Sequence, residues 1–167
     1  MKIKMLYKII LCVMTVFMMA FIFRMSAMEA DESSQLSTSV GYTIGGILVE
    51  GFEEMPADTQ EEYVEEIEHP LRKLAHFTEF MVLGFLLLLD VFVFTKLNGV
   101  KRSVVALVLG LAYAASDELH QLLVSGRSCE LRDVLIDVGG VVSGCVIASL
   151  VILIVRYARN RPAKDKE

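Results

Sequence analysis

The chain has 167 residues, of which 54% are hydrophobic, compared with about 45 to 50% in an average soluble domain. This length allows one domain, and the composition indicates a membrane protein. Lys and Arg number 16 and Asp and Glu number 21, so the net charge is −5 and the basic face that nucleic-acid binding requires is excluded. The three cysteines are odd in number and widely spaced, which indicates neither a disulfide framework nor a zinc site.

The first predicted element is an apolar run from Met5 to Phe23. Its 19 residues, at about 1.5 Å each, reach roughly the 30 Å thickness of the hydrocarbon core. We therefore predict that residues 1–27 hold an N-terminal transmembrane helix. A secretory signal peptide is the alternative, because Lys2 and Lys4 resemble its charged start, but Arg24 to Ala30 offers no clean cleavage pattern.

Residues 28–71 form an acidic segment. Its part from 28 to 69 holds 12 Asp and Glu residues and no Lys or Arg. Apolar residues at helical spacing between Val40 and Phe52, and Pro56 followed by 57–68, predict two amphipathic surface helices. The segment is either a solvated acidic linker with partial helix or a lid or docking surface over the outer end of the bundle.

Three more apolar runs of about 20 residues follow, at 74–94, 103–124 and 134–155, each long enough to cross a membrane. The predicted fold is an all-α membrane protein. It is a bundle of four transmembrane helices with an extracytoplasmic, acidic, partly helical segment between helices 1 and 2. Residues 72–156 form a core with three of the helices, and residues 157–167 form a basic cytoplasmic tail.

The distribution of Lys and Arg predicts the orientation of these helices. If the N-terminus is inside, 11 Lys and Arg fall on the inner side and 5 on the outer side. Short cytoplasmic loops carry the excess of positive charge, so both termini are expected in the cytoplasm.

Ionisable and polar residues within or beside the apolar runs are the candidate site residues, since each ionisable group costs about 2.5 to 3.5 kcal/mol at a helix centre. In the predicted orientation they gather at one level, at the outer ends of helices 2 to 4, except Asp90, which is expected to be solvated at the inner interface. The catalytic candidates are His76, Glu79 and Asp117. The polar-site set is Arg72, Lys73, His76, Glu79, Asp117, Glu118, Gln121, Arg127, Arg132, Asp133 and Asp137.

Gly140 and Gly144 continue a stripe begun by Asp133 and Asp137. Small residues four apart let another helix approach closely. We expect helix 4 to pack through these glycines, with its carboxylates facing the bundle interior.

Two motifs resemble those of the VanZ-like membrane proteins of bacteria. The first is RKLAHFTEF at 72–80, followed by Leu83 and Gly84; the second runs from SDELHQ at 116–121 through GRS at 126–128 and RDVLID at 132–137 to Gly144. The resemblance covers about 72–148. The chain departs from the pattern at Ser125, where many members carry proline, and at Leu122, where many carry an aromatic residue.

The resemblance implies a bacterial cell-membrane protein and an association with teicoplanin resistance, but no reaction. Three hypotheses stay open for the polar residues. They bind an amphiphile, either a lipid-linked cell-envelope molecule or a lipoglycopeptide; they form an intramembrane enzyme acting on a lipid phosphate or lipid-linked sugar; or they form a purely structural network.

A metal-assisted form of the enzyme would also draw on His120, but the spacing matches no recognised ligand pattern, so no metal and no cofactor are expected. The expected partners are the lipid bilayer and the amphiphilic ligand. The oligomeric state is left open.

Overall fold

The computed structural model of the chain describes residues 2–127 and 130–160. Its helices are α1 (Lys2–Ser26), α2 (Ala30–Leu48), the short 3-10 helix η1 (Phe52–Glu54), α3 (Ala57–Phe94), α4 (Gly99–Gln121) and α5 (Leu131–Asn160). Four of them, α1, α3, α4 and α5, are long and apolar enough to cross a membrane, so the predicted fold class is confirmed. Of the predicted basic tail, 161–167 lie outside the described residues.

The surface of these four helices fits a lipid environment. Large apolar side chains such as Phe17, Val104 and Leu153 are more than half exposed on three different helices. A helix satisfies its backbone hydrogen bonds internally, which is what a segment in hydrocarbon requires. The chain is therefore a membrane protein.

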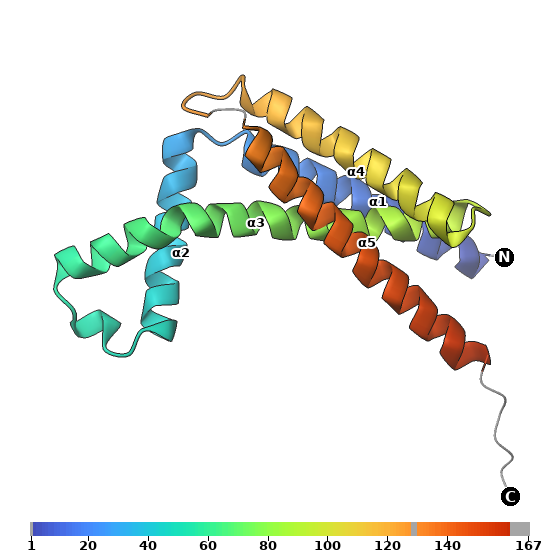
Figure 1. Ribbon diagram of the computed structural model, residues 1–167, viewed down its shortest axis with the longest axis horizontal. Helices are drawn as coiled ribbons and strands as arrows, with labels where there is room; N and C mark the ends of the chain where they lie inside the picture. Colours follow the sequence, from blue (N-terminus) through green and yellow to red (C-terminus); the bar gives the residue numbers. More distant parts are fainter. Residues whose placement is uncertain (1, 128–129, 161–167) are drawn as a thin grey trace, which may run out of the picture.

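Helix α3 is longer than its expected span. It begins after Pro56, where the sequence predicts a surface helix, but continues without a break through Pro70 to Phe94. Its 38 residues extend about 57 Å, nearly twice the hydrocarbon thickness. A proline inside a helix removes one hydrogen bond and bends the axis, and α3 changes direction near this point (Figure 1). The acidic first turns of α3 therefore lie beyond the apolar part of the bundle.

The acidic segment is more ordered than a solvated linker. Helix α2 starts ten residues before the expected Val40 and ends at Leu48, and Gly51, with a φ of 74°, turns the chain into η1. Gly41 and Gly45 of α2 face the side chains of Val64 and Phe52, which are both buried. The segment is thus a helical hairpin in which α2 crosses the first half of α3 (Figure 1).

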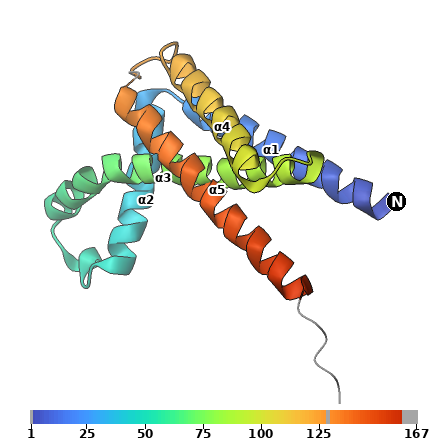
Figure 2. The same cartoon turned by 45° about the vertical axis from the view of Figure 1, so that its right-hand side comes forward.

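Helices α3 and α5 share the most extensive contact in the described chain. A Cβ on Gly140 would collide with backbone atoms of Phe77, and one on Gly144 with backbone atoms of Met81 and Phe85. Only glycine allows this approach, which seats α5 obliquely across α3 (Figure 2). The start of α1 and the end of α5 lie at the same end of the bundle, opposite the acidic hairpin (Figure 1).

Candidate functional site

A polar cavity of about 250 Å³ lies where α2, α3, α5 and the loop after α4 meet. Eight of the predicted polar-site residues line it: Arg72, Lys73, His76, Glu118, Gln121, Arg127, Asp133 and Asp137. The structure therefore brings together residues from three helices and one loop. Three other predicted residues do not line this cavity. Glu79 and Asp117 lie close to His76, which does, whereas Arg132 is exposed at the start of α5.

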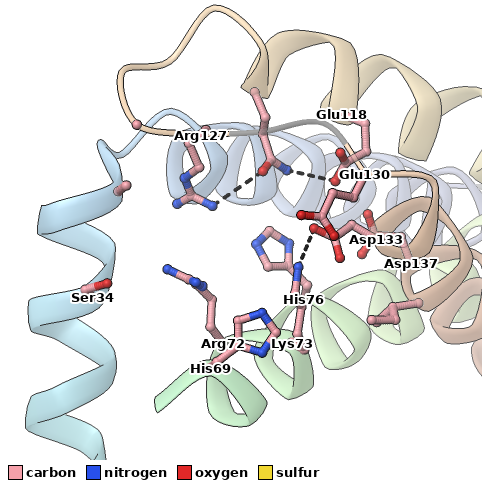
Figure 3. A pocket seen from close by; sticks show the side chains of 14 residues that line it. Ser34, His69, Arg72, Lys73, His76, Glu118, Arg127, Glu130, Asp133 and Asp137 are labelled. Carbon is pink, nitrogen blue, oxygen red and sulfur yellow. Dashed lines mark hydrogen bonds and ion pairs between the residues drawn. The ribbon is translucent and has the colours of Figure 1, made fainter. Parts of the chain in front are cut away.

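The charges in the cavity are separated into two sides. The cationic side chains of Arg72, Lys73 and Arg127 lie on one side and the carboxylates of Glu118, Glu130, Asp133 and Asp137 on the other, with the His76 ring between them (Figure 3). Lys73 crosses this division and forms an ion pair with Asp133. The cavity thus offers one surface suited to anions and one suited to cations.

Arg127 is held by neutral acceptors. Its Nε donates to the Met28 carbonyl at 3.2 Å and its Nη1 to Oε1 of Gln121 at 3.4 Å. Burial, and then the nearby Arg72, lowers the pKa of the Arg127 guanidinium, yet an arginine keeps its charge at any pH of interest. Its positive charge therefore remains available to a ligand.

The loop that carries Arg127 is fixed by two local features. Gly126 has a φ of 74°, a conformation that glycine adopts without strain, and the Ala30 amide donates to the Ser125 carbonyl at 3.3 Å. The loop is thereby attached to the first residue of α2. Ser125, which replaces the proline common in the resembled motif, contributes the carbonyl of that contact.

Asp117 lies behind the cavity in a buried hydrogen-bond network. Only 2% of its surface is exposed, and its Oδ2 accepts from Ser26 Oγ at 2.7 Å and from Gln121 Nε2 at 3.0 Å. Ser26, fully buried at the end of α1, was not among the predicted residues. A single serine at the end of an apolar run carries no signal in the sequence.

Next to the polar cavity is a smaller one of about 140 Å³ beneath α2. It shares Arg72, His76 and Arg127 with the polar cavity, and apolar side chains such as Leu36 and Leu71 line much of the rest. Glu79 also lines it, and its Oε2 is 4.0 Å from His76 Nδ1. A polar and a more apolar space therefore meet at the same three residues.

The surroundings of Asp90 differ from those expected from the sequence. It is not simply solvated at the inner interface, because its Oδ2 accepts a hydrogen bond of 2.6 Å from Thr15 Oγ1 and its Oδ1 is buried. Thr15 lies on α1, so this contact joins the first helix to α3 at the end of the bundle away from the polar cavity. The pairing depends on the packing of α1, which the sequence does not encode locally.

The arrangement can support three kinds of chemistry. The cationic side can bind phosphate or carboxylate oxygens, and the imidazole of His76 can accept a proton from a bound group. One ligand atom each from His76, Asp117 and Asp137 lie within 4.8 Å of one another, which is close enough for the three to hold a metal ion.

A sequence model described as VanZ/LLP1 matches residues 11–153, which is most of the chain and includes all the predicted polar-site residues. No curated protein matches the chain, and no solved structure matches it.

Proposed function

The chain belongs to the VanZ/LLP1 family, and on this basis we propose that it binds an amphiphile of the cell envelope through the polar cavity. The ligand is a lipid-linked cell-envelope molecule or a lipoglycopeptide such as teicoplanin. Its anionic group lies against the cationic side of the cavity, and its acyl part lies in the more apolar space beneath α2.

One observation carries this proposal: the two cavities share Arg72, His76 and Arg127. An amphiphile needs a polar and an apolar subsite side by side, and these three residues lie where the polar cavity and the more apolar cavity meet. A network that served only to fix helix register would be closed and dry, so a cavity of about 250 Å³ favours binding over a purely structural role.

The cations suit an anion with several oxygens. Arginine presents a planar fork that binds phosphate or carboxylate in a bidentate manner, and lysine adds a point charge. The Arg127 side chain donates to two neutral oxygens, so a ligand oxygen that replaces either of them gains a charge-assisted hydrogen bond without displacing a carboxylate. Arg72 is only loosely paired, at 3.8 Å from Glu68.

Binding to purified protein in phosphatidylcholine nanodiscs tests the proposal. The probes are teicoplanin, a polyprenyl phosphate and phosphatidylglycerol. Arg127→Ala is expected to weaken binding of at least one probe by roughly 10-fold or more, because a charge-assisted contact contributes about 1.5 to 3 kcal/mol. Arg132→Ala removes the same charge outside the cavity and is the matched control. Equal binding by wild type and Arg127→Ala would contradict the proposal.

The teicoplanin phenotype is tested separately in a susceptible bacterial host. Expression of the wild-type chain is expected to raise resistance to teicoplanin more than to vancomycin, which lacks the acyl chain. His76→Ala, Asp117→Ala and Arg127→Ala, matched for membrane abundance, are expected to lose this effect. If no variant differs from wild type, resistance does not depend on these three residues.

We also propose that the protein lies in the bacterial cytoplasmic membrane with both termini in the cytoplasm. Two observations support this orientation. Lys and Arg are in excess on the predicted inner side, 11 against 5, and the start of α1 lies at the same end of the bundle as the end of α5. A reporter that is active only in the cytoplasm, fused after residue 160, is expected to be active. The cavity then faces the outer leaflet, where cell-envelope precursors are used.

A second candidate function is hydrolysis of the bound lipid phosphate. It is favoured by the position of His76 between the anion-binding side and the carboxylates (Figure 3). Water would add to phosphorus as the bond to the lipid oxygen breaks; His76 would take a proton from that water as general base and return it to the leaving lipid oxygen. Release of inorganic phosphate from a polyprenyl phosphate, abolished in His76→Ala, is the expected result. Binding without release assigns the site to binding alone.

A further inference from the structure

The carboxylates in and beside the polar cavity outnumber the cations that face them. Asp117, Glu118, Asp133 and Asp137 come together from α4 and α5, and Glu79 joins them from α3, within electrostatic reach of Asp117. On the cationic side, Lys73 pairs with Asp133 and Arg127 is bonded to neutral oxygens. Charges of one sign are costly to bury together. Arg127 offsets part of this negative charge through space, and a cation or bound protons would balance the rest.

Three members of the cluster are placed to share one ion. His76, Asp117 and Asp137 come from α3, α4 and α5, and one ligand atom of each lies within 4.8 Å of the others. Ligands of a tetrahedral ion at about 2.1 Å lie roughly 3.4 Å apart, so small side-chain rotations suffice to close the site.

The two aspartates have oxygens to offer. Only 2% of Asp137 is exposed, and its Oδ2 has no hydrogen-bond partner among the described residues. Asp117 is equally buried; its Oδ2 is held by Ser26 and Gln121, while its Oδ1 has no partner within the same part of the chain. Hydrogen bonds to one oxygen of a carboxylate fix the direction of the other, as they do around metal ligands.

We propose that His76, Asp117 and Asp137 bind one divalent metal cation at the base of the polar cavity. One imidazole nitrogen and two carboxylate oxygens suit Zn²⁺ or Mn²⁺, and three protein ligands leave a coordination position open. The ion balances the charge of both aspartates. The site goes beyond the proposed function, which requires only the cationic side of the cavity.

Metal binding to the full chain in phosphatidylcholine nanodiscs tests this site without any lipid ligand. After treatment with chelator, the protein is titrated with Zn²⁺ and Mn²⁺, and bound metal is counted after desalting. One ion per chain is expected for wild type. Asp137→Asn and His76→Gln are each expected to weaken binding roughly 100-fold or more, because each removes a direct ligand.

Asp90→Asn is the matched control, since it neutralises a different, partly buried aspartate, which lies on α3 at the far end of the bundle. It is expected to bind one ion as wild type does. Equal binding by wild type and Asp137→Asn would assign the metal to the exposed acidic segment and overturn the proposal, as would no binding at all.

Circular dichroism and size exclusion check that the variants fold. If Asp137→Asn fails to fold, pulsed electron paramagnetic resonance of the Mn²⁺-loaded wild type decides instead. Coupling to a nitrogen nucleus is expected from the His76 ring, and its absence would overturn the proposal. The anion probes of the proposed function do not enter this test, so the two fail independently.

Discussion

The contact between α3 and α5 is built in two different ways along its length. In the middle, Gly140 and Gly144 bring the two backbones together, and no side chain separates them. Two turns closer to the start of α5, the same stripe carries Asp133 and Asp137, which line a cavity with Lys73. One face of α5 thus fixes the packing and presents the polar groups. The close middle contact therefore sets the distance across which the polar groups meet.

The largest expected effect is at the middle contact. Gly144→Ala places a Cβ against backbone atoms of Met81 and Phe85, which cannot move aside as a flexible side chain can. We expect a loss of stability on the order of 3 kcal/mol or more. In the same helix, Gly139→Ala meets only the edge of the Phe77 ring at 3.6 Å. It is expected to stay within about 1 kcal/mol of wild type.

Unfolding in detergent mixtures measures both glycine variants. Similar losses in the two would mean that helix propensity, and not close approach, explains Gly144.

Near the polar cavity, we expect stability to depend more on buried hydrogen bonds than on close packing of the helices. Ser26→Ala leaves the buried Asp117 carboxylate with one donor fewer, and a hydrogen bond to a charged group contributes about 1.5 to 3 kcal/mol. We expect a loss of about 1 to 2 kcal/mol in the same unfolding assay. Ser143→Ala, which removes only a bond of 2.9 Å to the Gly139 carbonyl of its own helix, is the control. An equal loss in both would contradict a network centred on Asp117.

A smaller difference is expected between two glycine variants, one of them in the loop at the polar end. Gly126 and Gly51 share a φ of 74°, so alanine is strained by about 1 to 2 kcal/mol at either position. At Gly126 the new Cβ also meets the Cβ of Ala30 at 2.9 Å, whereas at Gly51 nothing lies within 4 Å. Gly126→Ala is expected to cost roughly 1 kcal/mol more than Gly51→Ala. It should also weaken anion binding, because Arg127 follows directly. Equal binding in both variants would separate the loop from the site.

The smallest expected effect is at the opposite end, where Thr15 donates to Asp90 at 2.6 Å. Hydrogen bonds between membrane helices average about 0.6 kcal/mol, so Thr15→Val is expected to lower stability by about that amount. Thr78→Val is the control, because the Thr78 hydroxyl donates to the Leu74 carbonyl within its own helix. A loss above 2 kcal/mol, about the largest measured in such pairs, would show that this end is as critical as the polar end.

Much of the fold could be predicted because membrane helices are encoded locally. A segment in hydrocarbon must satisfy its backbone hydrogen bonds within itself, so 19 to 22 apolar residues in a row specify a helix without regard to neighbours. The same holds for the position of the candidate residues: Arg72, His76 and Asp137 lie at ends of apolar runs that alternate in direction. Their common level therefore follows from counting residues, and the structure gathers them around one cavity.

The contacts between helices, by contrast, depend on how the helices pack together. Ser26 meets Asp117 across 91 residues of sequence and Thr15 meets Asp90 across 75, and no local pattern announces either pair. Which segments are helical and at which end the charges lie can be read from the sequence, because hydropathy and segment length act within each segment. The rotation of each helix about its axis, which separates Asp137 from the exposed Arg132 and brings it near His76, depends on packing across the whole bundle.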